Sequence, residues 1–158
     1  MNETSAQTTQ RSLAKGLIAG LIGGLIGAAA KSAAEKLYPP RTQGQPPPPA
    51  VLAERFAGHS LTAGQKDLAA EAIHWSFGPI LGAAYGVLAE YAPAVTDRQG
   101  VTFGVALCSL TNEGALPALG LSAGMAKQPL REQSSEMISY SVYGFVTETV
   151  RKHIRKLL

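Results

Sequence analysis

Four glutamates stand within or beside long apolar stretches of the chain, where a carboxylate could bind a proton or an ion: Glu90, Glu113, Glu136 and Glu148. Acids inside a membrane usually carry function, because exposing them to lipid is expensive. Glu90 shortly precedes Pro93 and could simply end a helix, Glu136 suits the first turn of a helix, and Glu148 can pair with a cation one turn later. Glu113 has no such structural explanation and is our best single functional candidate.

Lys31 and Glu35 are separated by one helical turn and can form an ion pair. One interpretation is a self-neutralising pair near the end of a helix, with the lysine reaching toward the headgroups. The other is a charged site inside a helical bundle. We favour the first.

Glu71 and His74 form a Glu-x-x-His motif, which places both side chains on one helical face. Di-iron bundles carry this motif twice, with two further glutamates, whereas this chain carries it once. A hydrogen-bonded pair between helices, or a histidine near the headgroups, is therefore the preferred interpretation. A membrane enzyme or metal protein built on these residues is a third hypothesis for function. We find no nucleophilic triad, phosphate-binding loop, zinc motif or nucleotide fingerprint. The sequence thus predicts no catalytic residue, no bound metal and no cofactor.

The elements that must position these groups show a further pattern, in which small or polar residues recur every four positions. The columns are Gly23-Gly27-Lys31-Glu35, His74-Gly78-Gly82-Gly86-Glu90, Gly100-Gly104-Cys108-Asn112 and Glu136-Tyr140-Gly144-Glu148. Residues four apart share a helical face, and columns of small residues let helices approach closely in lipid. The glycines expected at helix contacts are Gly16, Gly20, Gly23, Gly27, Gly78, Gly82, Gly86, Gly100, Gly104 and Gly144. The candidate intramembrane polar site then comprises Lys31, Glu35, Glu71, His74, Glu90, Asn112, Glu113, Glu136 and Glu148.

These columns predict an all-α fold, a membrane-embedded bundle of about four transmembrane helices. We expect a polar, disordered N-terminus over residues 1–12 and a single transmembrane domain over 13–158. Its helices are expected at about 13–38, 63–92, 101–121 and 135–155. A polyproline spacer is expected at 41–50, a capping box at Thr62 and Gln65, and a break near Asn112–Pro117.

Composition alone would also fit a soluble domain, because hydrophobic residues make up 46% of the chain and its mean hydropathy is only +0.06. However, the segments 17–30 and 72–89 contain no Asp, Glu, Lys or Arg. The net charge of +3 does not indicate nucleic-acid binding, since the basic residues are scattered apart from four in 151–156. That basic group favours an anchor at anionic lipid and cytoplasmic termini. A cleaved signal peptide over the first helix remains the alternative.

Short segments in matching order resemble the YagU family of small bacterial inner-membrane proteins. They are Gly16–Gly20, Lys31, Glu35 and Pro39–Arg41; His74, Tyr85 and Glu90; Pro117–Leu121; and Ser135, Glu136, Val142, Glu148 and Arg151. The resemblance covers about residues 14–155 and implies a multi-pass inner-membrane protein of uncharacterised function, with no established cofactor. The family pattern has histidines where this chain has Asn112 and Tyr140, which argues against a histidine relay here. The loop after Arg41 is also shorter and richer in proline than the corresponding loop of the family.

The leading functional expectation is a membrane protein without catalytic machinery, a structural or accessory component of a homo-oligomer or a larger membrane complex. Its partners would be the lipid bilayer and other membrane helices rather than nucleic acid. The alternative is transport of protons, ions or small solutes through the intramembrane acids.

Overall fold

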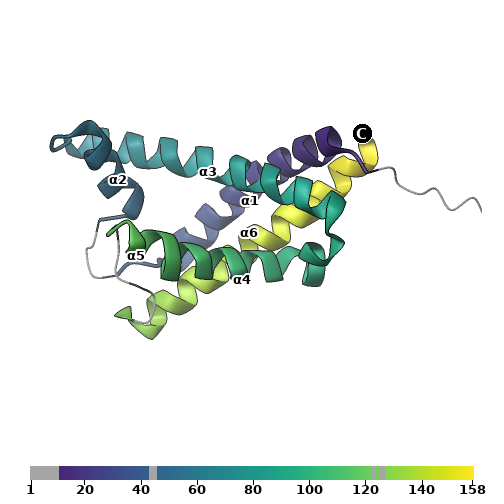
Figure 1. The fold of residues 1–158 in the computed structure, drawn as a ribbon. Helices are drawn as coiled ribbons and strands as arrows, with labels where there is room; N and C mark the ends of the chain where they lie inside the picture. The colour runs from purple at the N-terminus through teal and green to yellow at the C-terminus, as the bar shows by residue number, and fades with distance from the viewer. Residues whose placement is uncertain (1–10, 43–45, 122–123, 125–126) are drawn as a thin grey trace, which may run out of the picture.

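The computed structural model describes residues 11–42, 46–121, 124 and 127–158, and within these ranges the fold is all-α (Figure 1). The long helices are α1 (Leu13–Leu37), α3 (Ala63–Tyr91) and α6 (Leu130–Leu157), and the shorter ones are α2 (Pro48–Ala57), α4 (Val101–Ser109) and α5 (Leu116–Ala118). A 3₁₀ segment η1 (Pro93–Gly100) precedes α4, and a π-helical segment η2 (Leu110–Ala115) joins α4 to α5.

Helices α1 and α3 pack antiparallel through facing glycines. A Cβ atom on Gly20 would lie 2.7 Å from the Gly86 Cα, and one on Gly24 would lie 2.7 Å from the Gly82 Cα. No side chain larger than hydrogen fits at such distances, so the two backbones are in direct contact. The start of α1 therefore lies beside the end of α3.

Helix α6 packs against α1 on one side and α4 on the other. A Cβ on Gly23 would lie 2.6 Å from the Thr147 carbonyl oxygen, and one on Gly144 would lie 2.8 Å from the Gly104 nitrogen. The turn before α4 is strained, because Arg98 and Gln99 adopt positive φ angles of 49° and 58°. This turn delivers Gly100 onto Gly144 and so fixes the position of α4.

The start of α1 and the end of α6 lie at the same end of the bundle, where Lys15 donates to the carbonyl of Leu158 (Figure 1). We call this the termini end. The opposite end, which holds Tyr38, Thr42 and the start of α6, we call the far end. There Thr42 donates to Glu132 through both its backbone N–H and its hydroxyl, at 2.8 and 2.6 Å.

Three local expectations need correction. Residues 48–50 of the expected spacer are helical, because proline is tolerated in the first turn of a helix and Pro48 begins α2; residues 43–45 lie outside the described part. Helix α6 begins at Leu130 instead of 135, so that Glu136 lies in its second turn. Ser12 is ordered and caps α1, since its hydroxyl accepts from the Lys15 N–H; residues 1–10 of the expected disordered segment lie outside the described part.

The segment from Val101 to Ala118 is helical throughout, although its hydrogen bonding changes. The Leu116 N–H donates to the Thr111 carbonyl, five residues back, which is the π-helical pattern. Proline cannot donate to the helix and its ring crowds the carbonyl four residues earlier. The wider π turn relieves that conflict before Pro117, in the region where the sequence predicts a break. The run ends at Gly120, whose φ is +63°.

The distribution of side chains is inverted relative to a soluble protein. Among the described residues, the largest fully buried side chains are polar or aromatic apart from Cys108, and include Tyr85, Glu148, Asn112 and Thr147. Leu121 is the only buried branched aliphatic residue in the described ranges. The large apolar side chains are exposed: Leu17, Ile18, Leu21, Leu25 and Ile26 of α1, Phe77, Ile80 and Leu88 of α3, and Ile138 and Phe145 of α6. Soluble proteins bury these residue types preferentially.

Candidate functional site

A charged cluster occupies the far end of the bundle. Lys31 and Glu35 of α1 form an ion pair, and the Lys31 ammonium lies 4.4 Å from the centroid of the Tyr140 ring. The buried Glu136 carboxylate of α6 lies 3.9 Å from the Arg41 guanidinium. We call Lys31, Glu35, Arg41 and Glu136 the far-end cluster. Its two acids and two cations balance, as burial of charge requires.

Asn112, the last member of the Gly100–Asn112 column, points toward this cluster from the π-helical segment. Asn112 is buried, and its amide lies 3.5 Å from the Cys108 sulfur and hydrogen-bonds Glu136. Its neighbour Glu113 is exposed on the same segment. π-Helical turns often occur at functional sites because they re-aim side chains within a helix. Here the buried Asn112 amide and the exposed Glu113 carboxylate lie on different sides of the segment.

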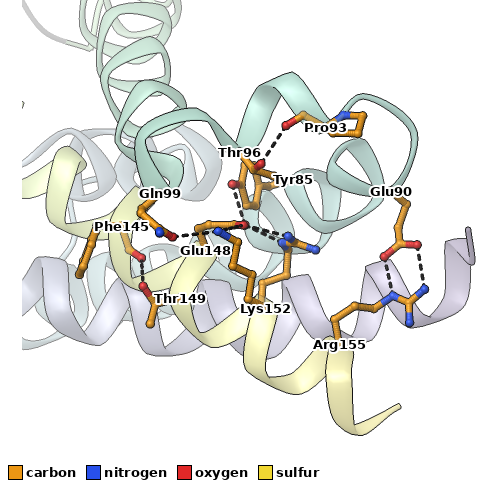
Figure 2. A network of polar contacts seen from close by, with 11 residues as sticks. Tyr85, Glu90, Pro93, Thr96, Gln99, Phe145, Glu148, Thr149, Lys152 and Arg155 are labelled. Carbon is orange, nitrogen blue, oxygen red and sulfur yellow. Dashed lines mark hydrogen bonds and ion pairs between the residues drawn. The ribbon is translucent and has the colours of Figure 1, made fainter. Parts of the chain in front are cut away.

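A second network lies toward the termini end and joins α3 to α6 (Figure 2). The Glu148 carboxylate accepts from the Tyr85 hydroxyl at 2.8 Å and from the Arg151 guanidinium at 2.6 and 2.9 Å. Lys152 lies 3.4 Å from the same carboxylate and donates to the Gln99 side chain at 2.9 Å. Glu148 is completely buried, so these donors replace its hydration.

Glu90 and Arg155 form the outer part of the same network (Figure 2). The Arg155 guanidinium donates to the Glu90 carboxylate through two nitrogens, at 2.5 and 3.0 Å. The same carboxylate accepts from the Ser12 N–H at 3.0 Å. Glu90 thus ties the ends of α3 and α6 to the beginning of α1.

A row of polar side chains on α6 connects the two clusters. Glu136, Ser139, Tyr143 and Thr147 are buried and recur every three or four residues, and the buried Glu148 directly follows Thr147. The Ser139 hydroxyl lies 3.4 Å from Glu35, and the Tyr143 hydroxyl donates to the Gly78 carbonyl at 2.7 Å. We call these five residues the α6 row.

The Glu71–His74 motif does not assemble as a pair. Glu71 accepts from the Trp75 indole at 2.8 Å, whereas His74 contacts the Ser32 hydroxyl of α1 at 2.8 Å. In the described part of the chain, no group of three or more His, Cys, Asp or Glu side chains is arranged to hold a metal ion. The candidate site therefore moves from Glu113, Glu71 and His74 to the buried Glu136 and its neighbours.

Two acids of the far end outside the long apolar spans have shifted pKa values. The Lys66 ammonium, 2.9 Å away, and the Leu61 N–H lower the pKa of Glu54. The two hydrogen bonds from Thr42 lower the pKa of Glu132. Both carboxylates are thus held ionised, and they fasten the far-end segments to the helices. Arg55 fastens α2 to the end of the α4–α5 run, because its guanidinium donates to the carbonyls of Leu119 and Gly120.

Sequence reasoning left several participants without a site role. Arg41, Ser139, Tyr143 and Thr147 were not singled out by chemistry, because hydroxyls and a loop arginine carry no motif. The buried partners of Glu148 and Glu90 come from distant segments, Tyr85 from α3 and Ser12 from before α1. The available signal was the helical spacing of polar residues along 136–148.

Two helices in the described ranges, α1 and α3, are long and apolar enough to cross a membrane. A search of curated proteins and a search of solved structures gave no match. Residues 25–149 match the family described as "Protein of unknown function (DUF1440)". That match includes the whole far-end cluster and the whole α6 row. The chain therefore belongs to this family of uncharacterised proteins.

Proposed function

We propose that the protein is a multi-pass membrane protein in which α1, α3, α6 and the run from α4 to α5 cross the bilayer. The observation that carries this proposal is the inverted side-chain distribution, with polar and small residues inside and large apolar residues outside. The run from Val101 to Ala118 measures about 27 Å at 1.5 Å per residue, close to the thickness of the hydrocarbon core. Helix α6 is less apolar than α1 and α3 because its polar row faces inward.

Exposed hydroxyl groups support the same proposal. Ser76, Ser109 and Thr149 each donate to the carbonyl four residues earlier in their own helix, at 2.7, 3.2 and 2.8 Å. A hydroxyl facing lipid must be satisfied in this way, because no water is available. Because the start of α1 and the end of α6 lie at the same end of the bundle, the helices between them make an even number of crossings. The resemblance to YagU proteins supports a bacterial inner membrane as its location, and the basic group at 151–156 supports cytoplasmic termini.

Membrane insertion is tested by washing membranes that contain the full-length chain with alkaline carbonate. The protein should stay in the pellet and leave it only with detergent. Folded protein in the detergent-free supernatant would overturn the proposal.

Within the membrane, the geometry best supports transport of protons or other small ions, with no catalytic step. Glu136 is a buried carboxylate with balancing cations and a π-helical neighbour, which is the arrangement expected of an intramembrane ion site. Proteoliposomes tested for proton, sodium and potassium flux should show a flux that Glu136→Gln abolishes. Glu113→Gln, which changes an exposed acid, should leave that flux intact. An absence of any flux in the parent protein would remove this function.

An accessory role in a larger assembly is the second candidate. The glycine columns no longer argue for it, because their members contact other helices of the same chain. Exposed apolar residues beyond the bundle do favour it: Phe56 of α2 and Leu68 of α3 are 82% and 73% exposed. The mass of the particle in mild detergent tests this role. A strictly monomeric species with no co-purifying protein would count against it.

A further inference from the structure

We infer that the transported ion is the proton and that the α6 row carries it between the two clusters. This inference rests on the transport function proposed above and adds the identity of the ion and its route. The row begins at Glu136 beside the partly exposed Arg41 and ends at Glu148 beside the half-exposed Lys152. Both ends therefore communicate with the surface, whereas the residues between them are buried.

The spacing of the row suits stepwise proton transfer. Glu136 and Glu148 are twelve residues apart, which is about 18 Å along a helix axis and too far for a direct transfer. The hydroxyl-bearing residues Ser139, Tyr143 and Thr147 divide this distance into rises of about 4.5, 6 and 6 Å along the helix axis, and Glu148 directly follows Thr147. Each such step is within reach of one bridging water or one rotating hydroxyl.

Thr147 provides an independent indication that water enters the row. Its hydroxyl is fully buried and makes no hydrogen bond of good geometry, although it lies within reach of the Tyr143 hydroxyl, whereas the Thr149 hydroxyl bonds to its own helix. A buried hydroxyl without a partner costs free energy unless an ordered water satisfies it. The orphaned Thr147 oxygen lies between Tyr143 and Glu148, where such a water would complete the row.

The proton balance is simple. Protonated Glu136 releases its proton to the next oxygen of the row, each hydroxyl or water accepts a proton on one side and releases its own on the other, and the Glu148 carboxylate receives the last. No bond to carbon changes and no oxidant is needed. Groups that face Glu136 are Lys31, Glu35, Arg41 and Asn112, and those that face Glu148 are Tyr85, Arg151 and Lys152.

Close packing argues against a metal cation on this route. A Cβ on Gly27 would lie 3.0 Å from the Tyr143 carbonyl oxygen and would overlap the Thr147 hydroxyl. Hard cations need about six oxygen ligands at once, and so narrow a passage cannot supply them. A proton needs only one lone pair at each step.

The test uses the full-length protein in liposomes loaded with a pH-sensitive dye, with a potassium gradient and valinomycin to set the membrane potential. The row variants are Thr147→Val, which is close to isosteric, and Tyr143→Phe. Thr149→Val is the matched control, since it removes a hydroxyl from the outer face of the same helix. Thermal unfolding in detergent verifies that each variant is folded.

We expect proton flux in the parent protein, at least a tenfold loss in each row variant and no change in Thr149→Val. Sodium or potassium flux without proton flux would overturn the inference while leaving the transport function standing. Proton flux that both row variants retain would also overturn the route. No flux of any of these ions would remove the transport function together with the inference.

Discussion

The Tyr85 hydroxyl of α3 donates to the same Glu148 carboxylate of α6 that Arg151 binds with two nitrogens. Two helices that are distant in sequence are thereby joined through one fully buried charge. Burial of the Glu148 charge therefore depends on both partners, but the two contribute unequally. Arg151 neutralises the charge, whereas Tyr85 only adds a hydrogen bond.

This inequality predicts different losses on removal of each partner. Arg151→Met should lower the free energy of unfolding by about 3–5 kcal/mol, because it leaves the buried Glu148 charge with only the half-exposed Lys152 as a counter-ion. Tyr85→Phe should lower it by about 1.5–3 kcal/mol, the usual range for a hydrogen bond to a charged group. Thermal and denaturant unfolding in detergent measure both. Equal losses, or a milder effect of Arg151→Met, would contradict the assigned roles.

Two glycines of α3 should respond oppositely to alanine. A Cβ on Gly82 would lie 2.7 Å from the Gly24 nitrogen, so Gly82→Ala should destabilise the protein by about 1–3 kcal/mol through overpacking. Gly64 lies in the same helix with open space around it, and Gly64→Ala should stabilise it by up to about 1 kcal/mol. Unfolding midpoints compare the pair directly. If Gly82→Ala were neutral, the direct backbone contact of α1 and α3 would be refuted.

Swapping the two residues of the Glu90–Arg155 ion pair should destabilise the protein less than reversing the charge of either residue alone. Glu90→Arg places two guanidinium groups together, and Arg155→Glu places two carboxylates together, so each should lower the unfolding temperature. The double exchange restores opposite charges, although the Ser12 N–H then loses its acceptor. We therefore expect partial recovery in a double-mutant cycle. Strict additivity of the two single changes would show that the pair is not formed.

The pH dependence of stability should reflect Glu132. Because Thr42 lowers the pKa of Glu132 in the fold below its ordinary value of 4.5, the unfolded chain takes up a proton first as the pH falls. The stabilisation is therefore complete above the ordinary value and is lost as the pH falls through the folded one. Thr42→Val removes the hydroxyl donor but keeps the backbone N–H, so acid unfolding should begin at a higher pH. An unchanged acid transition would contradict the assignment; Thr149→Val is the control.

Much of the fold follows from local pattern. Glycine spacing identifies the faces of α1, α3 and α4, because only a close helix contact makes so many helical glycines useful. The start of α3 is visible in Thr62, whose N–H donates to the Gln65 side chain at 3.0 Å. The sequence could not reveal which columns face each other, since that depends on contacts between residues such as Gly20 and Gly86 that lie far apart in the chain.

The site was less accessible to sequence reasoning. Glu113 was favoured because the sequence offered no structural role for it, yet its side chain is exposed and the neighbouring Asn112 is the buried residue. The Gly100–Asn112 column had placed Asn112 on the packing face of a regular helix, but an acid was preferred as the functional candidate. Glu136 looked like an ordinary first-turn acid only because α6 was expected to begin five residues later than it does.

The π-helical segment divides the run from α4 to α5 into two helical phases. Gly100, Gly104, Cys108 and Asn112 are buried along one line, and the line stops at Asn112 because the wider turn shifts every later residue around the axis. A π turn corresponds to one extra residue inserted into an α-helix. An alignment with a relative that lacks this extra residue therefore needs a one-residue gap at the π turn. Without that gap, the residues that follow Asn112 would be matched to the wrong positions of the relative.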